Sequence, residues 1–229
     1  MSEYRQYPRL HLLSLPSEIR NLIYDIIAIS DNPWQSEIRG STHGLTDWCL
    51  PISQLRPPSL AQVSRQTSQE YLSIFFAKRC IRLWMKLGRP RTSNKELWRI
   101  GVAKHVDSWL TEVMHPEVFY DGPMRSYEDQ IWSSNAPRFR NITIRFQDRI
   151  GVPLGANVDL RYNGAAKRFD ITLEWDQGWP RYSESTIDRI ERAFERLRTE
   201  LDFLAIDMRS NPGLSWWNVK ALAAAVGSV

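Results

Sequence analysis

The chain has few of the residues that enzymes use to bind metals or to form covalent intermediates. Its 229 residues include only two cysteines and four histidines. The two cysteines, Cys49 and Cys80, cannot build a disulfide framework, and free thiols are typical of a reducing compartment. We therefore expect a cytoplasmic or nuclear protein without structural disulfides.

The histidines show no spacing typical of a metal or catalytic site. They are His11, His43, His105 and His115. His43 and Cys49 would supply only half of a metal site, and His105 lies near Asp107 without an activated Ser or Cys motif. The G-x-S-x-G motif, a phosphate-binding loop and a dinucleotide fingerprint are also missing. These absences predict a protein that is not an enzyme, with no catalytic residues, no metal and no cofactor.

Long hydrophobic runs are absent as well. The longest apolar run, residues 221–226, is far shorter than the roughly 20 residues that span a bilayer. No N-terminal stretch has the residue order of a signal peptide, and Pro16 interrupts the apolar residues found there. We expect no membrane partner.

The pattern that is present near the N-terminus predicts an amphipathic helix. Pro16 fits the first turn of a helix because it lacks an N–H and its φ is fixed, and Glu18 complements the helix dipole in that turn. The helix is expected to end before Pro33, since the residue preceding a proline avoids the α region. Apolar side chains recur at three- and four-residue spacing: Ile19, Leu22, Ile23, Ile26 and Ile27.

A second helix is predicted to follow Pro57 and Pro58. Residues 31–57, between the two helices, have no sustained period, and we expect them either to hold a short strand near 48–50 or to lack regular structure. The apolar stripe of the second helix consists of Leu60, Val63, Thr67, Tyr71, Ile74 and Phe75.

Together, the two segments resemble a large group of fungal F-box-like proteins. The motif L-P-x-E-[IL]-R-x-x-I-Y is matched by Leu15, Pro16, Glu18, Ile19, Arg20, Ile23 and Tyr24. The second helix motif is matched by Leu60, Val63, Arg65, Gln66, Glu70, Phe75 and Phe76. Ser64 stands where the family usually has Cys. The resemblance covers about the first 85 residues.

The resemblance implies a non-enzymatic protein-interaction module, an F-box-type substrate adaptor of a ubiquitin ligase. Its protein partner would be a Skp1-type adaptor. The docking residues that it implies are Leu13, Leu15, Pro16, Ile19, Arg20 and Ile23. The alternative is that this segment only forms an N-terminal core element.

Beyond the second helix, alternating patterns predict strands and longer periods predict helices. A strand is expected over 79–85 and a helix over 95–114. Asn163-Gly164 is expected to supply the positive φ of a tight hairpin. Further strands are expected over 142–146, 158–162 and 168–175, and further helices over 183–207 and 215–226. Trp216 and Trp217 are candidates for exposure.

These elements predict an α+β fold. An N-terminal F-box-like helical hairpin would lead into a small antiparallel sheet packed against long helices, with strands pairing in sequence order. We divide the chain into an F-box-like segment, 1–85, and an α+β region, 86–229. No linker separates the two, so we expect one continuous compact domain.

Charge offers a rival function. The formal net charge is +4, and a basic cluster follows the second helix without an acidic residue inside it. Its members are Lys78, Arg79, Arg82, Lys86, Arg89 and Arg91. Such a cluster can bind an acidic protein or nucleic acid. In that alternative the F-box-like segment is only structural.

Overall fold

The computed structural model describes most of the helices and strands that the sequence predicts. The described residues are 11–30, 49–51, 55–87, 108–111, 113, 137–148, 152–176, 183–210 and 212–227. The predicted helix over 95–114 lies largely outside them, as do His43, His105 and His115. The combination of helices with a β-sheet confirms the mixed α and β content.

Two helices pack together in the N-terminal part. A 3₁₀ turn, η1 (Leu12–Ser14), precedes α1 (Ser17–Ser30). A second 3₁₀ turn, η4 (Ser59–Gln62), precedes α2 (Arg65–Lys78). Ser64 precedes the first residue of α2, and its hydroxyl accepts a hydrogen bond from the backbone N–H of Thr67 at 3.1 Å, which satisfies one otherwise unpaired donor of the first turn. Ser64 is therefore a helix cap.

The sheet has five strands in the order β1-β2-β3-β4-β5. Their bounds are β1 Cys49–Pro51, β2 Cys80–Lys86, β3 Asn141–Gln147, β4 Pro153–Asn163 and β5 Arg168–Trp175. The strands β3, β4 and β5 are antiparallel neighbours in sequence order, and this predicted pairing is confirmed.

The prediction of an antiparallel sheet is wrong for the other strands. Strand β2 is parallel to both β1 and β3. Parallel neighbours need a long connection that returns the chain to the starting edge. The helix α2 lies within the connection from β1 to β2, and a long segment separates β2 from β3. The sheet is therefore mixed.

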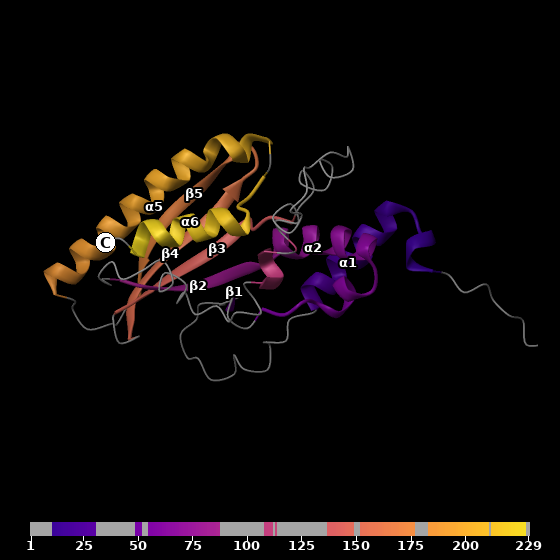
Figure 1. Cartoon of the computed structure of the whole chain (residues 1–229), viewed down its shortest axis with the longest axis horizontal. Coiled ribbons are helices and arrows are strands. Elements are labelled where there is room, and N and C mark those ends of the chain that lie inside the picture. Colours follow the sequence, from indigo (N-terminus) through magenta and orange to yellow (C-terminus); the bar gives the residue numbers. More distant parts are fainter. Residues whose placement is uncertain are drawn as a thin grey trace, which may run out of the picture.

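One face of the sheet carries the large apolar side chains of the core. Ile81 pairs in register with Ile142, and Leu83 with Ile144; all four side chains are buried. In Figure 1 the helices α5 (Glu184–Ser210) and α6 (Trp216–Gly227) lie along the sheet, and α5 contacts β5 while α6 contacts β2.

A chain of aromatic rings connects the N-terminal helices with the C-terminal helix. Tyr24 of α1 contacts Tyr71 of α2 with 5.8 Å between ring centroids. Phe76 then contacts Phe139 at 5.1 Å, and Phe139 contacts Trp216 at 6.3 Å. The expectation of an exposed Trp216 is wrong, because its ring is fully buried at the end of this chain. Its neighbour Trp217 is exposed.

The β4–β5 hairpin turns differently from the tight turn expected at Asn163-Gly164. The positive φ falls on Lys167, at 51°, and not on either of those residues. The Asn163 side-chain oxygen accepts hydrogen bonds from the backbone N–H groups of Ala165 and Ala166. This Asx-type turn closes a longer loop.

The turn makes Gly164 replaceable. Gly164→Ala is expected to raise the free energy of unfolding by about 0.5 kcal/mol, because Ala restricts the unfolded chain and its Cβ meets nothing within 4 Å. Urea denaturation measures this. Gly213→Ala is the contrasting variant and is expected to destabilise, because Gly213 has a φ of +106° and its added Cβ would lie 2.7 Å from the Phe139 carbonyl oxygen. Equal effects at the two positions would contradict the described turn.

Candidate functional site

A row of large apolar side chains along η1, Pro16 and α1 is exposed in the part of the chain that the structure describes. We call Leu13, Pro16, Ile19, Leu22 and Ile26 the N-terminal apolar ridge. The four aliphatic side chains are 40%, 44%, 58% and 66% exposed in chain order, and Pro16 is exposed as well. Positions 19, 22 and 26 share one side of a helix.

The opposite side of α1 makes the contact with α2. Tyr24 and Ala28 are buried there, and the two residues lie about half a turn of the helix away from Ile19, Leu22 and Ile26. The helix is thus apolar on two sides, and only one side contributes to the core. Exposed apolar residues in a row are a feature of protein–protein contact sites.

The structure places the predicted docking residues in three environments. Leu13, Pro16 and Ile19 are exposed, and Leu15 and Ile23 are half-buried. Arg20 forms an ion pair with Glu70 of α2 and is therefore not part of the ridge. The docking residues that the resemblance implies do not include Leu22 and Ile26, although the predicted apolar stripe contains both.

A polar cluster holds α1 against α2 beneath the ridge. The Arg20 guanidinium donates from Nε and Nη2 to the two carboxylate oxygens of Glu70, at 2.8 and 2.7 Å. The same carboxylate accepts from the Tyr24 hydroxyl at 3.2 Å and from the Gln66 amide at 3.0 Å. Arg20 also donates from Nη1 to the carbonyl oxygen of Leu15 at 2.6 Å. This cluster fixes the segment before α1, α1 itself and α2 in one arrangement.

Charge and burial shift the ionisation of this cluster. The Arg20 guanidinium lowers the pKa of Glu70 from 4.5 to about 2, because it donates to the ionised carboxylate. Hydrogen bonding to Glu70 raises the pKa of Arg20. Burial raises the pKa of Tyr24. The cluster is thus a charged pair with a tyrosine donor, and its members are occupied in joining the two helices.

The basic cluster does not form one exposed patch in the part of the chain that the structure describes. Lys78 is exposed, and its Nζ lies 3.5 Å from Oδ1 of Asp25. Such a surface ion pair contributes little to stability. Arg79 is half-buried with its guanidinium 5.6 Å from the centroid of the Phe75 ring. Arg82 is half-buried on β2. The side chains of Lys86, Arg89 and Arg91 lie outside the described residues.

Other types of site find little support among the described residues. Within them, no three His, Cys, Asp or Glu side chains come together as a metal site would require. None of the described helices combines the length and the hydropathy needed to cross a membrane. The N-terminal apolar ridge is therefore our candidate functional site.

Comparison with known proteins found no match, whether with family models, with curated proteins or with solved structures. The fold and the ridge define an α+β protein with an exposed apolar helix face.

Proposed function

We propose that the chain is a non-enzymatic interaction protein that docks on a partner through its N-terminal apolar ridge. The observation that carries the proposal is the exposure of Ile19, Leu22 and Ile26 on the side of α1 opposite to its packed side. Full burial of one such side chain is worth about 2 kcal/mol. A partner that supplies a hydrophobic groove would gain this from several side chains at once, in the helix-in-groove mode.

The partner we propose is a Skp1-type adaptor of a ubiquitin ligase. The support is the resemblance of the α1 and α2 sequences to F-box-like motifs, together with the exposure of Leu13, Pro16 and Ile19. In this proposal, residues 1–85 form the F-box-like hairpin and residues 86–229 hold a substrate protein. The setting would be cytoplasmic or nuclear.

The Arg20–Glu70 pair has a supporting role in this proposal. Both residues belong to the matched motifs, and their contact orients α1 before any partner arrives. A preorganised helix loses less conformational freedom on binding than a mobile one. Arg20 would thus position the ridge without touching the partner.

Titration calorimetry of the full chain with a purified Skp1-type adaptor tests the proposal. We expect saturable binding with a negative heat-capacity change, the marker of buried apolar surface. Absence of binding heat at several temperatures, with folded protein on both sides, would contradict the proposed partner.

A further inference from the structure

The strand β5 forms one end of the sheet, and none of the described strands pairs with its outer edge. The Asp176 backbone N–H donates to the Gly155 carbonyl oxygen at 2.7 Å, across the β4–β5 pair. Successive residues of an antiparallel strand direct their backbone groups alternately to either side. Asp170, Thr172 and Glu174 therefore bond β4, whereas the residues between them point away from the sheet.

Phe169, Ile171 and Leu173 are three of the residues whose backbone groups point outward. Among the residues that the structure describes, these groups have no backbone partner beyond β5. Ile171 and Leu173 are only half-buried, so their side chains leave apolar surface uncovered next to that edge. Unpaired edges of this kind are templates for another strand.

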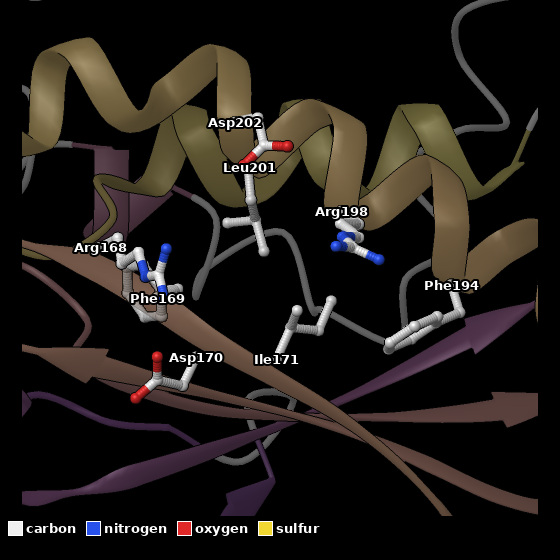
Figure 2. Close-up of a pocket in the computed structure, with 8 residues that line it drawn as sticks. All are labelled: Arg168, Phe169, Asp170, Ile171, Phe194, Arg198, Leu201 and Asp202. Carbon is white, nitrogen blue, oxygen red and sulfur yellow. The ribbon is translucent and has the colours of Figure 1, made fainter. Parts of the chain in front are cut away.

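A groove lies beside this edge, between β5 and α5 (Figure 2). Its volume is about 400 Å³, and its apolar lining comes from Phe169, Ile171, Phe194 and Leu201. Charged side chains of both signs form the rest of the lining: Arg168, Asp170, Arg198 and Asp202. A strand added at β5 would place its own apolar side chains against the open side of this groove.

We propose that β5 pairs antiparallel with β5 of a second copy of this chain, with Ile171 facing Ile171 across a two-fold axis. The outward residues then form hydrogen-bonded pairs: Ile171 with its equivalent and Phe169 with Leu173 of the second copy. Each such pair exchanges two backbone hydrogen bonds. The resulting sheet is continuous across the two copies.

Charge complementarity selects this register. With Ile171 on the axis, Arg168 faces Glu174 of the second copy, and Glu174 faces Arg168 of the second copy. These are non-hydrogen-bonded pairs, in which opposite side chains come closest. Shifting one strand by two residues along the other places Asp170 opposite Asp170 of the second copy in one direction. In the other direction the same shift places Asp170 opposite Glu174 of the second copy. Like charges directly opposite one another are destabilising.

A charge-swap experiment tests this dimer independently of the ridge. Sedimentation velocity of the full chain over a range of concentrations is expected to show a monomer–dimer equilibrium. Glu174→Arg is expected to raise the dimer dissociation constant roughly tenfold or more, because two attractive pairs become repulsive. The double variant Arg168→Glu/Glu174→Arg is expected to restore dimerisation.

Restored dimerisation in the double variant would report on contacts between the two copies and not on contacts within one copy. Arg168 and Glu174 lie at opposite ends of the same strand, and they face Asn163 and Asn157 of β4. The control is Glu195→Arg, an equal charge change at an exposed position of α5, which is expected to leave dimerisation unchanged.

Three results would overturn the proposal. They are a wild-type chain that stays monomeric at every concentration, a dimer that Glu174→Arg does not weaken, and a weakened dimer that the double variant does not restore. The second result would place the dimer contact elsewhere, and the third would exclude this register.

Discussion

Ile19→Asp/Ile26→Asp is expected to weaken binding of the Skp1-type adaptor at least about 100-fold while leaving the protein folded. Each isoleucine that becomes buried in a partner contributes about 2 kcal/mol, and a carboxylate buried there without a partner costs more. Every 1.4 kcal/mol corresponds to about tenfold in affinity. The measurement is titration calorimetry of wild type and variant with the same adaptor.

A matched control separates the ridge from exposed apolar surface in general. Phe203 of α5 is 77% exposed and lies outside the ridge. Phe203→Asp therefore introduces the same side chain at another exposed apolar position and is expected to leave adaptor binding unchanged. If the ridge variant binds as tightly as wild type, or if Phe203→Asp weakens binding equally, the ridge is not the docking site.

Glu70→Ala is expected to lower the free energy of unfolding by about 2 kcal/mol. The substitution removes the carboxylate that accepts hydrogen bonds from the Tyr24 hydroxyl and the Arg20 guanidinium. Tyr24 is fully buried. Donors left without acceptors in a partly buried site cost about 1–3 kcal/mol. Urea denaturation at neutral pH provides the measurement. Glu191→Ala, at an exposed position of α5, is the control and is expected to change stability by less than about 0.5 kcal/mol.

The stabilising effect of Glu70 is expected to depend on pH. The folded-state pKa of about 2 lies below the ordinary value of 4.5, so the folded state binds this proton less readily than the unfolded state does. The contribution is therefore complete above about pH 4.5 and is lost as the pH falls through 2. The stability difference between wild type and Glu70→Gln should shrink over that window. A difference that stays constant from pH 6 to about pH 2 would contradict the assigned ion pair.

Local patterns were sufficient to predict several elements. Helical spacing of apolar residues predicted a helix over 183–207, which is α5, and alternation predicted a strand over 142–146, which is β3. The order of β3, β4 and β5 followed because short connections favour neighbours. These elements depend on interactions within a short stretch of sequence.

Contacts between residues far apart in the sequence could not be predicted from local patterns. The parallel pairing of β2 with β3 depends on the path of the long segment that joins the end of β2 to the start of β3. No local sequence pattern contains that information. The division of α1 into a packed side and a ridge depends on where Tyr71 of α2 meets Tyr24. The periodicity showed one apolar stripe but could not show which apolar side chains α2 would cover.

The Arg20–Glu70 pair was present in the sequence without being recognised. Both residues lie in the motifs that carry the resemblance, and their opposite charges on two neighbouring helices were the available signal. The sequence gives no distance between the helices, so the pairing required the structure.

The unfolding free energy of Ile26→Ser tests most directly whether the ridge is uncovered in the free protein. Ile26 is 66% exposed, and we predict a change within about 0.5 kcal/mol of wild type. Tyr71→Ala serves as the buried reference, with an expected loss of about 3–5 kcal/mol. A loss of about 2 kcal/mol or more for Ile26→Ser would show that this side chain is packed within the chain, and would contradict the proposed docking surface.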